Sequence, residues 1–233
     1  MRICASIGAK NLGALERLIK KALSMGADYI EIRFDFLKIS EIEAAIKIAE
    51  PTKSRAVFTL RSADEAGTFE GSENKRVALL KRLSTAGPML LDVEYLTIRD
   101  NDDLADFLIS QRTPILVSWH DFKRTPPSNQ LRDILAQMKI YSNYAKIVTM
   151  AKDADDAFRV LELYEGITGV KLIAFAMGEF GIISRILCTM AGNAPFTYAT
   201  VERSTAPGQQ DLCYMRRLFD RINSFYYWKT NAN

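Results

Sequence analysis

The 233-residue sequence predicts an α/β protein, a single-domain (β/α)8 barrel (TIM barrel) that covers residues 1–233. Three observations lead to this prediction. Short apolar segments alternate with helical patterns eight times, each repeat approaches the ~30 residues of a β-α-β step, and no linker or low-complexity segment divides the chain. Eight such repeats are the number that closes a barrel of this type.

An open, doubly wound sheet is the competing architecture. Such sheets usually carry the glycine-rich turn GxGxxG after their first strand. Here that turn reads Gly8-Ala-Lys-Asn-Leu-Gly13, which does not match the pattern. An open sheet also provides no reason for the alternation to stop at eight, so we favour the barrel.

The expected strands are short apolar runs between polar, glycine or proline residues. They cover residues 2–8, 29–36, 55–60, 89–96, 115–119, 145–150, 171–176 and 196–201. Apolar residues at helical spacing predict helices over residues 12–25, from 40 onward, and over 72–86, 100–111, 128–141, 153–166, about 180–191 and about 211–226. We expect the second helix to begin with a capping box, in which Ser40 is the N-cap and Glu43 the third helical residue.

Composition excludes several classes of protein. The formal net charge is +3 and no run of five Lys or Arg occurs, so nothing indicates a nucleic-acid partner. No apolar run reaches 18 residues and the amino terminus lacks a signal-peptide pattern, so we expect no membrane association and a cytoplasmic location. Cys4, Cys188 and Cys213 have no CxxC spacing and indicate buried thiols of a reducing compartment. One histidine rules out a His-rich metal site, and we expect neither metal nor cofactor.

Charged residues occur where the expected strands end. The carboxyl ends of barrel strands meet at one face, so such residues can build a site there. They are Glu31, Arg33 and Asp35 on strand two, Arg61 after strand three, Asp92 and Glu94 on strand four, His120 after strand five, Lys146 on strand six, and Arg185 after strand seven.

Each of these residues also has a structural explanation. Backbone groups can satisfy a lone histidine, residues 31–35 can form an ion-pair ladder, Lys146 can extend to solvent, and Arg185 can lie on a helix surface. Natural cores rarely bury charge on four strands for structure alone, so a polar site at the barrel mouth is the better interpretation.

These residue types suit one chemistry. We expect Lys146 in a desolvated pocket lined by other cations, where its neutral amine can attack a carbonyl and form a Schiff base. The iminium acidifies the adjacent carbon, from which a neutral His120 can remove a proton and later return it to a departing hydroxyl. Arginine binds carboxylates with two parallel hydrogen bonds. The residues therefore indicate a Schiff-base lyase acting on a small ketone that carries carboxylate and hydroxyl groups.

At this point the chain resembles type I 3-dehydroquinate dehydratase over essentially its whole length. The resemblance rests on six short motifs in order: Glu31-x-Arg33-x-Asp35, Thr59-x-Arg61-Ser62, Ser118-x-His120-Asp121-Phe122, Ala145-Lys146-Ile147, Met177-Gly178 with Gly181 and Ser184-Arg185, and Ala206-Pro207-Gly208-Gln209. It implies a cytoplasmic hydro-lyase (EC 4.2.1.10), commonly a homodimer, that converts 3-dehydroquinate to 3-dehydroshikimate in the shikimate pathway, towards chorismate and the aromatic amino acids.

The resemblance also implies roles for single residues. Lys146 would form the Schiff base, and His120 would take the C2 proton and protonate the departing C1 hydroxyl in a syn elimination. Glu65 would orient the histidine, and Asp92 would neighbour the imine. The expected substrate-binding residues, with Arg185 on the carboxylate, are Ser6, Glu31, Arg33, Arg61, Arg185, Thr205 and Gln209.

Some alternatives stay open. The family motif has serine directly before Ala-Pro-Gly-Gln, whereas this chain has Thr205 there and Ser204 one residue earlier. A class I Schiff-base aldolase is the alternative function, and an inactive barrel acting as a binding protein is a third. The aromatic stretch at residues 225–228 suits either core packing or self-association.

Overall fold

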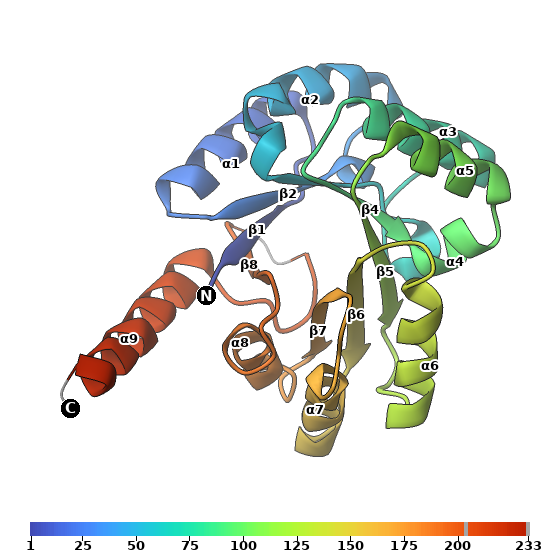
Figure 1. Cartoon of the computed structure of the whole chain (residues 1–233). Coiled ribbons are helices and arrows are strands. Elements are labelled where there is room, and N and C mark those ends of the chain that lie inside the picture. The colour runs from blue at the N-terminus through green and yellow to red at the C-terminus, as the bar shows by residue number, and fades with distance from the viewer. Residues whose placement is uncertain (203–204, 232–233) are drawn as a thin grey trace.

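Eight short parallel strands form the centre of the molecule (Figure 1). The computed structural model describes residues 1–202 and 205–231, with residues 226–231 described by their backbone alone. The strands are β1 (Ile3–Ile7), β2 (Tyr29–Arg33), β3 (Ala56–Thr59), β4 (Leu90–Glu94), β5 (Ile115–Asp121), β6 (Tyr144–Met150), β7 (Lys171–Met177) and β8 (Thr197–Thr200). They lie in one sheet in the order β7-β6-β5-β4-β3-β2-β1-β8. The predicted fold class is confirmed: the strands make a nearly closed barrel.

Helices connect the strands and cover the outside of the sheet (Figure 1). They are α1 (Leu12–Ser24), α2 (Ile42–Ala49), α3 (Glu73–Thr85), α4 (Tyr95–Arg99), α5 (Asp102–Gln111), α6 (Ser128–Met138), α7 (Ala154–Leu161), α8 (Ile182–Met190) and α9 (Leu212–Asn231). Several begin as their sequence suggests. Asn11 and Asp153 cap α1 and α7 by accepting a hydrogen bond from a backbone N–H in the first turn.

Backbone hydrogen bonds join each pair of neighbouring strands in the barrel except β7 and β8. Along these two strands, both fully described, no backbone ladder joins one to the other. Aromatic side chains pack across the space instead: the rings of Phe175 on β7 and Tyr198 on β8 lie 6.2 Å apart, and Phe196, just before β8, packs against Tyr198 at 5.5 Å. Side-chain packing therefore completes the barrel at this seam.

Two hydrophobic layers result from the alternation of side chains along each strand. The larger layer lies between the strands and the helices and includes Ile30, Ile32 and Ile147. The smaller layer fills part of the barrel interior and includes Val57 and Leu116. Inward-facing positions nearer the carboxyl ends of the strands carry polar side chains, so the interior is apolar at one end and polar at the other.

Three expectations about local structure were wrong. The second strand ends at Arg33, and Phe34–Phe36 form a 3-10 turn in which Phe34 and Asp35 stay buried although the backbone is no longer extended. The fourth strand ends at Glu94, where the short helix α4 follows directly. Ser40 is not an N-cap: the chain enters α2 through a 3-10 turn over Ile39–Glu41, and the backbone N–H of Lys38 donates to Glu41 Oε2 at 3.2 Å.

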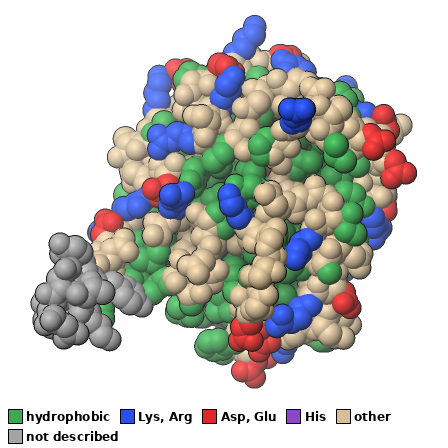
Figure 2. Space-filling view, viewed as in Figure 1, with side chains coloured by type: hydrophobic (Ala, Val, Ile, Leu, Met, Phe, Trp, Pro, Cys, Tyr) green, Lys and Arg blue, Asp and Glu red, His purple; other side chains and the backbone are tan. Residues whose placement is uncertain are grey.

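On the face shown in Figure 2, Lys and Arg side chains are interspersed with hydrophobic ones. No helix in the described part of the chain has the length and apolar character needed to cross a membrane. Helix α9 points away from the barrel (Figure 1). Phe225, at the start of the aromatic stretch, is exposed, whereas the side chains at positions 226–228 lie outside the described ones.

Candidate active site

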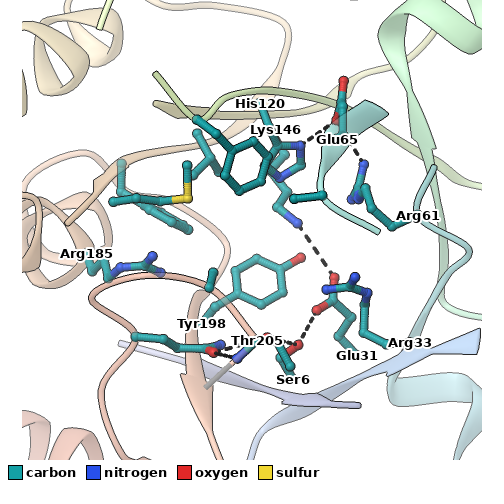
Figure 3. A pocket seen from close by; sticks show the side chains of 17 residues that line it. Ser6, Glu31, Arg33, Arg61, Glu65, His120, Lys146, Arg185, Tyr198 and Thr205 are labelled. Atoms are coloured by element: carbon teal, nitrogen blue, oxygen red, sulfur yellow. Dashed lines mark hydrogen bonds and ion pairs between the residues drawn. The ribbon is translucent and has the colours of Figure 1, made fainter. Parts of the chain in front are cut away.

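A cavity opens at the carboxyl ends of the strands. All of the residues given a role in the predicted site line it except Asp92, which is buried directly against Lys146. Asp35 and Glu94, the other charged residues at the strand ends, do not line it and pair with Arg33 and Arg76. Figure 3 shows their side chains converging from strands far apart in the sequence. The lining residues are Ser6, Glu31, Arg33, Arg61, Glu65, Ala66, His120, Phe122, Lys146, Val148, Phe175, Met177, Arg185, Tyr198, Thr205, Ala206 and Gln209.

Lys146 lies at the centre of the interior, on β6, and is only 5% exposed, so it does not extend to solvent. Its Nζ is 3.3 Å from Asp92 Oδ2 and 3.6 Å from Glu31 Oε1. The cavity is lined by other cations as expected (Arg33, Arg61 and Arg185), but the charged groups nearest to this amine are carboxylates. Two carboxylates at this distance stabilise positive charge on the nitrogen, in an ammonium or in an iminium.

His120 is part of a buried pair with Glu65. The strand β5 extends to Asp121, so His120 lies within the strand, and its Nδ1 is 2.7 Å from Glu65 Oε2. This contact uses one ring nitrogen and leaves Nε2 for the cavity. Burial lowers the pKa of His120 well below its usual value, and the positive charges of Arg61 and Lys146 add to the effect. The imidazole is therefore neutral near pH 7 and suited to act as a base.

Glu65 reaches His120 because of a tight turn after β3. Residues Ala63–Glu65 form a 3-10 turn, and the N–H of Gly67 donates to Ser62 O at 2.8 Å. A Cβ on Gly67 would lie 2.2 Å from the carbonyl oxygen of Arg61, so only glycine allows this return of the chain. Burial raises the pKa of Glu65 to about 8, although Arg61 opposes the rise.

Arg61 joins the histidine pair to the lysine. Its guanidinium donates to Ser118 Oγ and Asp92 Oδ1, both at 2.8 Å, and to Glu65 Oε2 at 3.2 Å. Burial alone would lower the pKa of Arg61, but the surrounding carboxylates outweigh it and raise the pKa. Most of the hydrogen bonds that the Arg61 guanidinium can donate thus go to protein groups, and these bonds hold Asp92 and Glu65 in place.

Arg33 is also occupied by a protein carboxylate. Its Nε and one terminal nitrogen donate to the two oxygens of Asp35 at 2.8 and 2.7 Å. The sequence placed Asp35 on the same strand face as Arg33, but Asp35 lies in the 3-10 turn that follows the strand. The turn allows this bidentate contact between residues only two positions apart.

Arg185 differs from the other cations of the site because no described carboxylate pairs with it. It is 2% exposed, which excludes a surface position on the helix. One terminal nitrogen donates to Pro207 O at 3.0 Å, the guanidinium lies over the Phe175 ring at 4.4 Å, and Nε has no hydrogen-bond partner in the described structure. Burial lowers the pKa of Arg185 to about 10. A buried cation without a counter-ion is suited to bind an anionic ligand group.

A chain of hydrogen bonds closes the opposite side of the cavity. Thr205 Oγ1 donates to Ser6 Oγ at 3.0 Å, and Ser6 Oγ in turn donates to Glu31 Oε2. The backbone N–H of Thr205 donates to Gln209 Oε1 at 2.9 Å. Thr205 therefore supplies a hydroxyl at this position, and Ser204, the alternative, lies outside the described residues.

The loop that carries these residues packs closely against the end of β7. Gly208 has a φ of +71°, and a Cβ there would lie 2.5 Å from the carbonyl oxygen of Gly178. Only glycine permits both the backbone conformation and the close approach. The Ala206-Pro207-Gly208-Gln209 motif thus brings Gln209 to the cavity and Pro207 O to Arg185.

Sequence reasoning missed Tyr198, which lines the cavity, and gave no role to Ser118, whose hydroxyl lies between Arg61 and Asp92. Ser118 lies two positions before His120, so strand alternation places both on the inner face. The same alternation from Phe196 places Tyr198 inside the barrel. The signal was present in the strand period, but neither residue carries a charge that draws attention. Among the described residues, no group of three or more His, Cys, Asp or Glu could hold a metal ion.

Comparisons with known proteins agree with this geometry. The family model described as type I 3-dehydroquinase matches residues 3–224. A 3-dehydroquinate dehydratase of Dehalococcoides mccartyi is 38% identical over 205 residues, covering 86% of this chain and 88% of the relative. One from Desulfotalea psychrophila is 33% identical over 226 residues, covering 94% and 97%. In fold, the chain is similar to the crystal structure of type I 3-dehydroquinate dehydratase from Clostridium difficile, with a TM-score of 0.85 at 24% identity, covering 96% of this chain and 92% of that one.

Proposed function

The chain belongs to the type I 3-dehydroquinase family, and from this premise we propose that it dehydrates 3-dehydroquinate to 3-dehydroshikimate through an imine on Lys146. The relatives are named for this reaction, which belongs to the shikimate pathway. The observation that carries the imine mechanism is a buried lysine amine and a neutral histidine on neighbouring strands of one cavity.

The first step joins the substrate to Lys146. The Lys146 ammonium gives up a proton, and the amine then adds to the C3 carbonyl carbon. The carbonyl oxygen leaves as water with the two protons that the nitrogen loses, so one ammonium and one ketone give one protonated imine and one water. Asp92 and Glu31 flank the nitrogen at 3.3 and 3.6 Å and stabilise the iminium charge. The iminium withdraws electrons from the neighbouring C2–H bond and makes its proton acidic.

The second step is the elimination. His120 Nε2 takes the C2 proton, the C–H electrons form the enamine, and the same imidazolium then protonates the C1 hydroxyl, which leaves as water. Glu65 keeps Nδ1 occupied at 2.7 Å and so directs Nε2 to the substrate. Hydrolysis of the product imine returns the free amine of Lys146.

Substrate binding follows from the charge distribution. Arg185 would hold the substrate carboxylate, because its buried charge has no protein counter-ion among the described residues. Glu31 would accept hydrogen bonds from ring hydroxyls, and Ser6, Thr205 and Gln209 would close over the substrate. Arg33 and Arg61 would act mainly by holding the carboxylates of the site in position.

The mechanism is tested by adding borohydride together with substrate. We expect a reduced, covalent adduct whose mass maps to the peptide that contains Lys146. The ultraviolet absorbance of the enone product reports turnover of 3-dehydroquinate in parallel. Turnover without any adduct would refute the imine, and activity only on a phosphorylated aldol substrate would favour the class I aldolase alternative.

We also propose that the protein is a cytoplasmic homodimer. All three cysteines are free thiols, which suits a reducing compartment, although Cys213 is exposed and not buried as expected. Phe180 and Ile183, at the start of α8, are large hydrophobic side chains that are 52% and 45% exposed, which supports self-association through this helix. Light scattering should report a dimer, Ile183→Asp should give a monomer, and Ile109→Asp on α5 should stay dimeric. A monomeric wild type would contradict this proposal.

A further inference from the structure

The hydroxyl of Tyr198 is the buried polar group that the mechanism above does not use. Tyr198 is 4% exposed, and its Oη has no hydrogen-bond partner in the described structure. Buried hydroxyls are nearly always paired, so an exception calls for an explanation. Tyr198 lines the cavity, and in Figure 3 its hydroxyl end is directed toward the space between Lys146 and Glu31. The missing partner therefore belongs where the substrate would bind.

Packing holds the Tyr198 ring in one position. The residue lies on β8, paired in register with Cys4 of β1. Its ring packs at 5.5 Å against Phe196 and at 6.2 Å against Phe175. A ring fixed on several sides presents its hydroxyl to the cavity without a loss of freedom on binding, which is the condition for an effective preorganised donor.

The surroundings keep this hydroxyl protonated. Burial raises the pKa of Tyr198 well above its usual value, and the negative charge of Glu31 and Asp92 adds to the rise. The phenol is therefore an O–H donor rather than a base near neutral pH. Its natural partner is an oxygen that gains negative charge.

The lysine lies directly over the same ring, because Lys146 Nζ is 4.3 Å from the Tyr198 ring centroid. A carbonyl carbon attacked by Nζ lies one bond length from that nitrogen, so the addition takes place beside the ring that carries this hydroxyl. No other tyrosine lines the cavity among the residues that the structure describes.

We propose that Tyr198 is a further catalytic residue, whose Oη–H donates a hydrogen bond to the carbonyl oxygen of the keto substrate while Lys146 adds to the carbonyl carbon. The C–N bond forms, the carbonyl π pair moves to oxygen, and the oxygen gains a proton as the nitrogen loses one. The carbinolamine oxygen then leaves as water. In sum, one ammonium and one ketone give one iminium and one water, and Tyr198 keeps its own proton. This inference rests on the proposed imine mechanism.

The variant Tyr198→Phe removes only the hydroxyl and keeps the ring. Rapid mixing with 3-dehydroquinate, quenching into borohydride and mass measurement of the Lys146 adduct give the rate of imine formation. We expect this rate to fall about 100-fold, the usual effect of removing one such donor. The thermal midpoint of the ligand-free variant should equal or exceed that of the wild type, because the lost hydroxyl had no partner.

Tyr164→Phe is the matched control. Its hydroxyl is also buried, but it accepts from Ala174 N at 2.7 Å and donates to Ala174 O at 3.1 Å, and it does not line the cavity. This variant should lose thermal stability and form the imine at the wild-type rate.

Two outcomes would overturn the inference about Tyr198 alone. One is a wild-type rate of imine formation in Tyr198→Phe, and the other is an effect confined to steps after the imine, which would place the phenol on another substrate group. A wild type that turns over 3-dehydroquinate without forming any adduct would instead overturn the proposed mechanism, and this inference with it.

Discussion

Replacing Arg185 by methionine should make the ligand-free protein more stable and the enzyme far less active. Methionine fills much of the same apolar channel but carries no charge. In the wild type the guanidinium is fully buried, donates one hydrogen bond to Pro207 O, and leaves Nε without a partner in the described structure. Such a group is a cost to folding that only a bound anion relieves.

The size of the effect follows from the pKa. A fall in the pKa of Arg185 from 12.5 to about 10 means that folding disfavours its charged form by about 3 kcal/mol. The variant loses one hydrogen bond and the contact with the Phe175 ring, together about 1 kcal/mol. The net gain in unfolding free energy is then about 2 kcal/mol, which raises the melting temperature by about 5 °C for a chain of this size.

Activity should change in the opposite direction. Loss of a buried, charge-paired contact to the substrate carboxylate typically costs about 3 kcal/mol or more, so kcat/KM should fall at least about 100-fold. Calorimetric melting with and without product, together with the enone assay, measures both effects. Arg61→Met is the control, because it removes the cation that pairs with Glu65 and with one oxygen of Asp92 and should lower stability. A destabilised Arg185→Met with an unchanged KM would refute the reasoning.

Two further predictions concern the histidine pair. His120→Ala should still form the borohydride-trapped adduct on Lys146 but lose turnover by at least about 100-fold, since general acid–base catalysis contributes that much or more; near-normal turnover would defeat the role given to His120. Glu65→Gln tests the raised pKa of about 8. Because the folded state keeps the Glu65 proton up to that pH, whereas the unfolded state loses it near 4.5, wild-type stability should fall as pH rises from about 4.5 to about 8 and then level off. Urea unfolding of Glu65→Gln should lack this slope, and equal slopes in both proteins would contradict the assignment.

The sequence determined the fold class because the pattern behind it is local. Apolar runs such as Ile115–Val117 and helical spacing such as that of 12–25 depend only on near neighbours in the chain, and eight repeats leave few architectures. The ends of the elements were less predictable. The alternation of apolar and charged residues in β2 continues through Phe34 into the following turn, which is largely buried as well. A pattern of buried positions does not by itself distinguish a strand from a turn.

For the site as well, some features could be predicted from the sequence and others could not. Lys146 and His120 were predicted because a lone titratable group in an apolar strand, or at its end, is visible in the sequence itself. Which groups lie next to them was not visible in the sequence. The charged groups nearest to Lys146 proved to be the carboxylates of Asp92 and Glu31. That outcome depends on the register between strands 50 or more residues apart, which no local pattern encodes.

Tertiary structure alone decided which polar groups have partners. Arg61 and Arg185 are the same residue type near the same cavity, yet carboxylates from other strands neutralise the first and none in the described structure reaches the second. Likewise the Tyr198 hydroxyl has no hydrogen-bond partner in the described structure, whereas the hydroxyl of the half-buried Tyr164 both donates and accepts a hydrogen bond. The sequence determined that the barrel mouth is polar, whereas contacts between distant segments decided which of its groups are left to bind a substrate, because burial removes water as an alternative partner.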